Sequence, residues 1–193
     1  MKFAASLSVV LMLLAGAAHA QPGPAKGSGF PGDFGRPFNG LPLPDGPLPP
    51  RPPTPPLARG IAMDLALEAA KEAVAACDGY HVGVSIVDSA GMPKLYYIPD
   101  GTAGFHAYTG FRKAYTALKF REATSQVGAA TKIDPTVVAK IAADANLLSF
   151  AGGLPIFVGD DIVGAIGVSG AEPSAVDERC ALAALDKIRT RLR

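Results

Sequence analysis

The stretch HVGVSIVDSAGMPKLYYIPD, residues 81–100, decides the fold of this chain. Its β-branched residues Val82, Val84 and Ile86 alternate with other residues, which is typical of a strand with one face toward a core. Residues 89–91 supply turn chemistry, and a second strand-like run follows them. The stretch therefore predicts an antiparallel hairpin. His81 begins its first strand and is interpreted as a partly exposed polar residue.

A second hairpin is predicted further along, in GGLPIFVGDDIVGAIGVSG at residues 152–170. Two apolar runs flank Gly159, Asp160 and Asp161, which are residues that a tight reversal favours. Both hairpins are bordered by segments with helical periodicity. Because hairpins separated by helices favour an antiparallel sheet covered by helices, the predicted fold class is α+β.

Four segments show the apolar spacing of helices that bury one side. The first covers residues 60–79, and the second, residues 106–122, lies in the quoted stretch AGFHAYTGFRKAYTALKF and its continuation. A shorter helix begins around Asp134 and Pro135, and a closing one covers residues 174–192. The predicted buried stripes are Leu67, Ala70, Val74 and Cys77; Ala107, Phe111, Ala114 and Leu118; and Val176, Cys180, Ala184 and Ile188.

The chain of 193 residues divides by composition into three parts. Residues 1–20 predict a signal peptide, since Lys2 precedes an apolar run and Ala18-His19-Ala20 resembles a cleavage site. We expect cleavage after Ala20 and a periplasmic or secreted protein, rather than a membrane anchor. Residues 58–193 suit one domain with one core.

Residues 21–57 hold 13 of the 18 prolines. Such a segment cannot bury enough apolar surface to offset its backbone entropy, which predicts a disordered, partly polyproline II linker. The alternative is a docking segment for an aromatic-lined groove or a spacer to a surface.

The charge balance excludes two classes of partner. The chain has 18 basic and 17 acidic residues, and removal of Lys2 with the signal leaves the two equal. A neutral chain lacks the basic excess that nucleic acids or anionic membranes attract, so we expect neither partner.

Two cysteines, Cys77 and Cys180, lie on the apolar stripes of the first and last helices. In an exported protein a disulfide between them is favoured, and in the loop-entropy model it would contribute roughly 4 kcal/mol. The alternative is two buried free thiols. The chain has no C-x-x-C pair, which disfavours a metal site built on these cysteines.

His106 is the candidate ligand contact. Arg112 and Lys113 follow it, and Tyr108 offers flat apolar surface. An imidazole is a common iron ligand, and cations match carboxylates such as haem propionates. The alternatives are that His106 caps a helix, and that Lys113 lies along the helix surface or pairs with Asp88 or Asp100.

Two glycine-containing segments are further candidates for ligand binding. Gly152 and Gly153 allow close backbone approach and could form an anion-binding nest, or they form a plain loop before a strand. Ser169 and Gly170 precede the last helix, where an anion could bind. The sequence contains no nucleophile elbow, Walker loop, H-E-x-x-H motif or evident Ser/His/Asp set.

Four ordered motifs carry a family resemblance: VGVSIVDSAG, FRKAYTALKFREAT, GGLPIFVGDDIVGAIGVSGA and VDERCALAALDKI. In this order and spacing the chain resembles the GlcG/HbpS-like haem-binding or haem-degrading domain proteins, which are related to the C-terminal domains of PduO-type proteins. The resemblance covers roughly residues 60–190.

The resemblance implies a single profilin-like α+β domain with an antiparallel sheet of about five strands, assembly into homo-oligomers, and binding or sensing of haem. In one branch the segment before K-A-Y-T-A reads G-P-H, and Gly104-Phe105-His106 matches it except for phenylalanine in place of proline. Many relatives carry Arg-x-Asp-Gly where this chain has Ile98-Pro99-Asp100-Gly101, so an anion clamp built on that arginine is in doubt.

Three functional hypotheses follow. The leading one is an exported protein that binds or senses haem or a similar flat anionic small molecule, with His106 as the contact or iron ligand and Arg112 and Lys113 near its carboxylates. The second is a haem-degrading or small-metabolite enzyme, although the sequence offers no convincing catalytic set and we name no catalytic residues. The third is an oligomeric accessory module without catalysis.

Overall fold

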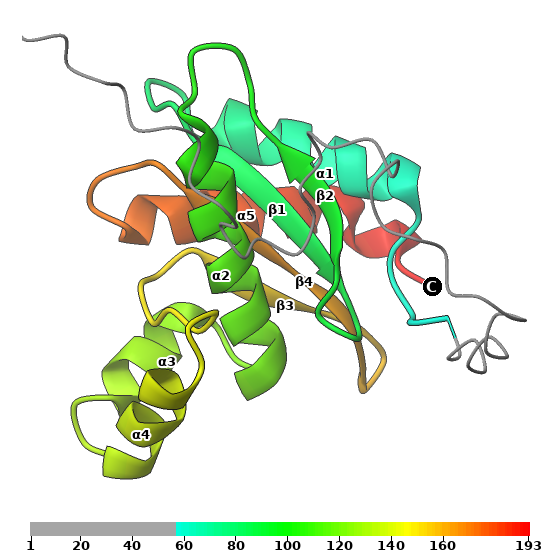
Figure 1. The fold of residues 1–193 in the computed structure, drawn as a ribbon. Helices are drawn as coiled ribbons and strands as arrows, with labels where there is room; N and C mark the ends of the chain where they lie inside the picture. Colours follow the sequence, from blue (N-terminus) through cyan, green and yellow to red (C-terminus); the bar gives the residue numbers. More distant parts are fainter. Residues whose placement is uncertain (1–56) are drawn as a thin grey trace, which may run out of the picture. The chain divides into compact units, whose positions relative to one another are not determined.

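The computed structural model describes residues 57–193, and the predicted signal peptide and almost all of the predicted linker lie outside them. The described residues form an α+β domain, as predicted. Figure 1 shows the order of its elements. These are α1 (Met63–Ala76), β1 (Gly83–Asp88), β2 (Pro93–Tyr97), α2 (Gly104–Phe120), α3 (Thr124–Ala130), α4 (Pro135–Ala143), β3 (Gly153–Val158), β4 (Asp161–Ser169), α5 (Ala175–Ile188) and the 3-10 turn η1 (Arg189–Arg191).

The two predicted hairpins join into one antiparallel sheet with the strand order β2-β1-β4-β3. β1 and β4 lie at the centre, where Ile86 of β1 is opposite Ile166 of β4. The described residues form four strands, whereas the family resemblance implied about five. The hairpin of residues 81–100 thus supplies one central and one edge strand, and the second hairpin supplies the other two.

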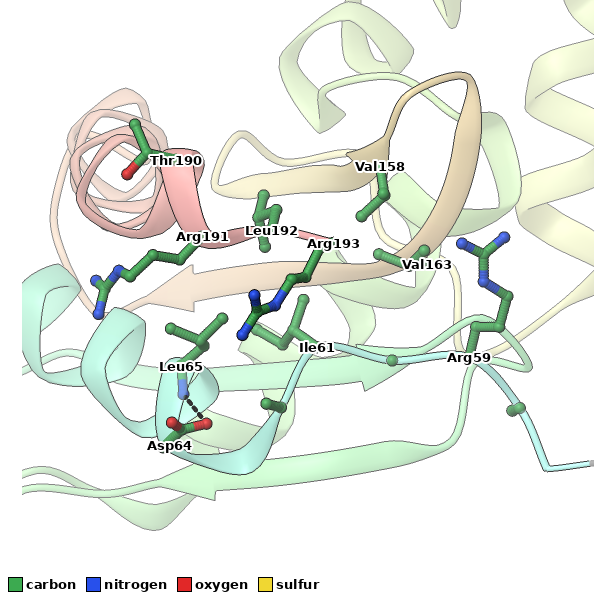
Figure 2. A pocket seen from close by; sticks show the side chains of 13 residues that line it. Arg59, Ile61, Asp64, Leu65, Val158, Val163, Thr190, Arg191, Leu192 and Arg193 are labelled. Carbon is green, nitrogen blue, oxygen red and sulfur yellow. Dashed lines mark hydrogen bonds between the residues drawn. The ribbon is translucent and has the colours of Figure 1, made fainter.

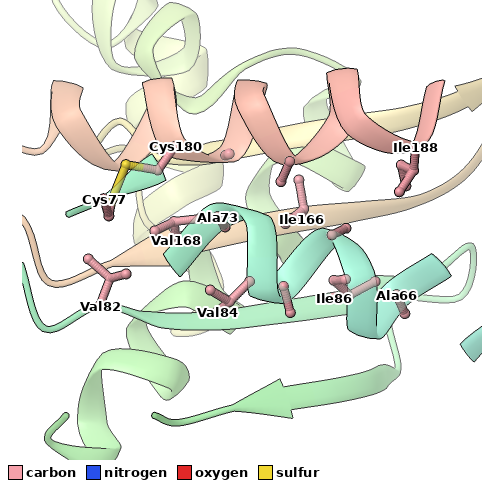
Figure 3. Close-up of a cluster of buried hydrophobic side chains, with 14 of the residues drawn as sticks. Ala66, Ala73, Cys77, Val82, Val84, Ile86, Ile166, Val168, Cys180 and Ile188 are labelled. Carbon is pink, nitrogen blue, oxygen red and sulfur yellow. A yellow bond between two sulfur atoms is a disulfide. The ribbon is translucent and has the colours of Figure 1, made fainter. Parts of the chain in front are cut away.

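The main core lies between the sheet and the helix pair α1 and α5 (Figure 3). Val82, Val84 and Ile86 are fully buried against these helices, as their alternation predicted. The opposite face of the sheet is also covered, because α2 packs on it around Val87 and Ala165. Helices therefore cover both faces, and β1 is buried almost from end to end.

The α1 helix faces the core with most of the predicted stripe and with further alanines beside it. Ala66, Ala69 and Ala73 are fully buried, whereas Leu67, expected in the core, is 37% exposed. Alanines leave room for α1 and α5 to lie close together, which a stripe with leucine would not allow. Of the predicted stripe, Ala70 and Cys77 are buried and Val74 packs against the core, so the prediction was wrong only for Leu67.

A disulfide between Cys77 and Cys180 links α1 to α5, which confirms the prediction (Figure 3). The two residues are 103 positions apart in sequence, and both are buried. The bond closes most of the described chain into one loop.

Helix α2 ends at Phe120, and the next residue, Arg121, adopts a left-handed conformation with φ of 58°. The prediction placed this helix at residues 106–122 and did not include the short helix α3 that follows. Asp134 accepts a hydrogen bond from the Thr136 N–H, so the predicted start of α4 is confirmed. In Figure 1, α3 and α4 extend away from the sheet, and α4 buries none of its residues.

Within residues 57–193 no helix combines the length and the apolar character that a membrane span requires.

Candidate functional site

An open pocket of about 340 Å³ lies beside the first half of α2. The helix contributes four lining residues, Phe105, His106, Thr109 and Lys113. His106, Thr109 and Lys113 lie on one side of α2, because they are three and four positions apart. The segment between β4 and α5 forms the opposite wall, and Phe150 also lines the pocket. The pocket therefore contains the histidine that the sequence singled out.

A larger pocket of about 560 Å³ lies elsewhere, between the start of α1 and the end of the chain (Figure 2). Two arginines at its border are already paired, Arg59 with Asp161 and Arg191 with Glu68. It contains none of the candidate site residues. We therefore place the candidate site at the smaller pocket, which is lined by His106, Lys113 and Ser169.

His106 is the third residue of α2 and is half-buried at the pocket wall. Its backbone N–H donates to the Ala103 carbonyl oxygen, and its ring lies 4.1 Å from the Phe105 ring, centroid to centroid. Among residues 57–193 the imidazole has no hydrogen-bond partner. A neutral imidazole with a free nitrogen is a good ligand for iron.

Lys113 and Asp177 form a buried ion pair at the pocket floor, with Nζ 2.7 Å from Oδ2. Their side chains are 3% and 1% exposed. The second oxygen of Asp177 accepts the Ala171 N–H at 2.9 Å. An ion pair for Lys113 was expected, but its partner is Asp177 and not Asp88 or Asp100.

Burial dominates the electrostatics of this pair. Desolvation lowers the pKa of Lys113, although the nearby Asp177 carboxylate opposes that shift. Desolvation also raises the pKa of Asp177, against the attraction of Lys113 and the backbone N–H donors. Both shifts favour the neutral amine and the neutral carboxyl group. The shared proton is therefore held on Lys113 less strongly than it would be in a solvent-exposed ion pair.

The two glycines proposed as an anion-binding nest are engaged within the protein. The Gly152 N–H donates to Glu178 Oε2 at 3.1 Å, and the Gly153 N–H donates to Thr124 Oγ1 at 2.8 Å. Gly152 has a φ of 125°, and a Cβ there would lie 2.9 Å from Lys113 Nζ. The glycines thus make room for the ion pair and offer no free donors to a ligand.

Two other predicted contacts lie away from the pocket. Arg112 donates through Nη2 to the Leu147 carbonyl oxygen at 2.9 Å, and its buried Nε has no partner in the described residues. Tyr108 is 52% exposed and stacks on Phe111, on another side of α2. His106, Lys113 and Ser169 line the pocket, whereas Arg112 and Tyr108 do not.

Comparison with protein families gives a match over residues 61–186 to the model described as haem degrading protein HbpS-like. The chain belongs to this family. The HbpS-like region includes every strand of the sheet and the whole candidate site. Comparison with curated proteins gave no significant match.

Solved structures agree with the HbpS-like assignment. The crystal structure of HbpS is 30% identical, covers 68% of this chain and 92% of its own, and has a TM-score of 0.62. A double mutant of HbpS from Streptomyces reticuli is 29% identical, with 74% and 97% coverage and a TM-score of 0.62. A PduOC:heme complex, 20% identical, shares the fold over 66% and 94% of the chains with a TM-score of 0.59.

Sequence reasoning missed several residues of this HbpS-like site. Thr109 was recognisable in principle, because it lies between His106 and Lys113 on the same side of the predicted helix. Asp177 was not, because its contact with Lys113 joins residues 64 positions apart. Phe150 and Glu172 belong to loops, whose positions follow only from the assembled fold.

Proposed function

We propose that this HbpS-like protein binds haem or a similar flat molecule at the pocket beside α2, with His106 as the contact to the metal. The observation that carries the proposal is an imidazole without a hydrogen-bond partner in the described residues, at the wall of an open pocket in a domain of this family. A structural neighbour, PduOC, has been solved as a complex with heme, and this supports the same ligand class.

The residues present fit the flat, apolar part of such a ligand. Phe105 and Phe150 are each 64% exposed at the pocket. Exposed aromatic rings beside a cleft offer surface on which a macrocycle packs. A volume of about 340 Å³ is near the lower end of the range for ligand pockets, so the ligand would be enclosed only in part.

The residues fit the carboxylates of haem less well than the sequence predicted. Lys113 is paired with Asp177, and Arg112 is directed to Leu147. Glu172 adds an acidic side chain to the wall. We therefore propose that the propionates face solvent. The haem would contact the protein through its iron, at His106, and through its apolar macrocycle, at Phe105 and Phe150.

A haem titration tests the proposal. Hemin added to the purified protein should give a sharp Soret band, and His106→Ala should weaken binding by about tenfold or more, which corresponds to about 1.4 kcal/mol. His81→Ala is the matched control, since His81 is exposed, lies two residues before β1 and does not line the pocket. An identical spectrum and affinity in His106→Ala would overturn the assignment.

Haem degradation is the second candidate, favoured by the description of the matching family. Incubation of the hemin complex with a reductant tests it through loss of the Soret band and release of iron. A spectrum that stays constant over many hours under these conditions would leave binding as the function. Export to the periplasm or outside the cell, sensing and assembly into homo-oligomers belong to the same proposal and rest on the sequence and the family resemblance.

A further inference from the structure

The buried Lys113–Asp177 pair is not explained by haem binding, which uses the neighbouring imidazole. A buried ion pair contributes little net stability compared with apolar residues of similar size, because both charges lose their hydration. Here the pair lies on the floor of a pocket instead of deep in the core. Titratable groups perturbed by burial within a cleft are candidates for chemistry.

The geometry around the amine is that of an anchored acid beside a nucleophile. Asp177 is fixed from one side by the Ala171 N–H and contacts Lys113 Nζ on the other. The ammonium has three donors, and Asp177 is its one hydrogen-bond partner among residues 57–193. Gly152 packs beside Nζ, and any side chain at this position would collide with the amine.

The pocket charge indicates which ligands this amine would meet. Lys113 is neutralised by Asp177, and Glu172 leaves the lining acidic. An anion is therefore disfavoured, whereas an uncharged polar molecule is accepted. Thr109, Ser169 and Ser174 supply hydroxyl groups that donate to or accept from such a molecule.

We infer that Lys113 forms a reversible imine with a small uncharged aldehyde or ketone in this pocket. The lone pair of the neutral amine attacks the carbonyl carbon, and the C=O π electrons move to oxygen, which takes a proton from Asp177. The Asp177 carboxylate then takes a proton from the attached nitrogen, which gives the neutral carbinolamine. Asp177 passes this proton to the hydroxyl group, which leaves as water while the nitrogen lone pair forms the C=N bond, and the product is a protonated imine beside the Asp177 carboxylate. Hydrolysis reverses the step, so no oxidant or reductant is consumed.

Burial supports the required protonation states, since it lowers the pKa of Lys113 and raises the pKa of Asp177. Imine formation at Lys113 does not depend on the proposed haem function, because it uses a different side chain and no metal.

Reductive trapping tests the inference. The full chain is incubated at neutral pH with dilute acetaldehyde and cyanoborohydride, and alkylation of each lysine is measured by peptide mass spectrometry. Lys113 should be modified faster than the exposed Lys71 and Lys140, because burial lowers the pKa of Lys113 and so leaves more of its amine unprotonated at neutral pH. A solely structural ion pair predicts the opposite order, with Lys113 the slowest, and that result would overturn the inference.

Two variants complete the test. Asp177→Asn keeps the amine and removes the acid, so trapping at residue 113 should fall by about a hundredfold or more, since a general acid contributes about 10²–10⁴-fold. Lys113→Met/Asp177→Leu removes both charges and preserves apolar packing, and it should show no adduct at this site while keeping the circular dichroism spectrum of the parent. Pyruvate, an anionic carbonyl compound, should label Lys113 less than acetaldehyde, and equal or greater labelling would contradict the assignment of an uncharged ligand.

Discussion

At the residue scale, the pocket combines residues that the sequence identified, such as His106, with others that it could not, such as Asp177. His106 was recognisable because it precedes a helix rich in cations and aromatic rings, in a position that matches a family motif. The role of Lys113 was left open between surface, ion pair and ligand. Its true partner, Asp177, lies in another helix, and no local pattern in the sequence relates the two.

Removal of Lys113 alone should destabilise the fold strongly at neutral pH. Lys113→Met leaves the Asp177 carboxylate buried without its cation, which costs about 3–5 kcal/mol for such pairs. Lys113→Met/Asp177→Leu should recover most of that loss. Urea denaturation of the three proteins measures the difference, and a single variant as stable as the parent would show that the pair is not buried.

The loss of unfolding free energy caused by Lys113→Met should also depend on pH. Burial raises the pKa of Asp177 in the folded state, so folding favours the protonated carboxyl. The stability that this provides is present below the unfolded value of about 3.9 and is lost as the pH rises through the raised folded value. The free energy of unfolding of the variant should therefore approach that of the parent as the pH falls from neutral toward about 4.

At the element scale, glycines set the close contact between α2 and the sheet. A Cβ on Gly110 would lie 2.8 Å from the Gly167 carbonyl oxygen, and one on Gly167 would overlap the backbone of α2. The sequence showed these glycines inside a helix and a strand but not that they face each other. The small residues that decide helix placement here, including the buried alanines of α1, carry little hydrophobic signal, which is why Leu67 was assigned to the core stripe of α1 and Ala66, Ala69 and Ala73 were not.

Gly167→Ala should separate α2 from β4 and reduce stability by about 1–3 kcal/mol or more, the cost of overfilling a packed contact. Gly104→Ala is the control, since a Cβ at this first residue of α2 would have no neighbour within 4 Å. Thermal unfolding of both variants measures the effect. Equal melting temperatures for Gly167→Ala and the parent would refute the close contact.

The disulfide between α1 and α5 acts at the same scale, because it holds the two helices that cover one face of the sheet. With a sequence separation of 103, its loss should cost about 4–5 kcal/mol in the loop-entropy model. Guanidinium unfolding of Cys77→Ser/Cys180→Ser tests this. Reductant should lower the stability of the parent and leave the double variant unchanged, and a parent insensitive to reductant would contradict the expectation.

At the scale of the whole molecule, the order of hairpins and helices was predictable. The apolar periodicity and the turn residues that indicate each element lie within the sequence of that element. The α+β class and the helix pair joined by the cysteines follow from that order. Residues 57–193 form four strands, whereas the family resemblance implied about five. Helix α3 was not predicted, because a helix of 7 residues is too short to show a clear apolar period.

Export remains a prediction from residues 1–20. The full chain expressed in a bacterial host with a periplasm should be recovered there with Gln21 as its first residue, because a signal peptidase cleaves after small residues such as Ala20. N-terminal sequencing and intact mass measure this. Recovery of the complete chain in the cytoplasm would contradict the prediction.

The central claim is that a flat macrocycle binds at the pocket beside α2 and not at the larger pocket near the end of the chain. Titration of ¹⁵N-labelled protein with diamagnetic gallium protoporphyrin tests it most directly. The account predicts that the backbone amide signals of His106, Thr109 and Ala171 shift. Shifts confined to Ile61 and Leu192, which line the larger pocket, or no shift at all, would contradict it.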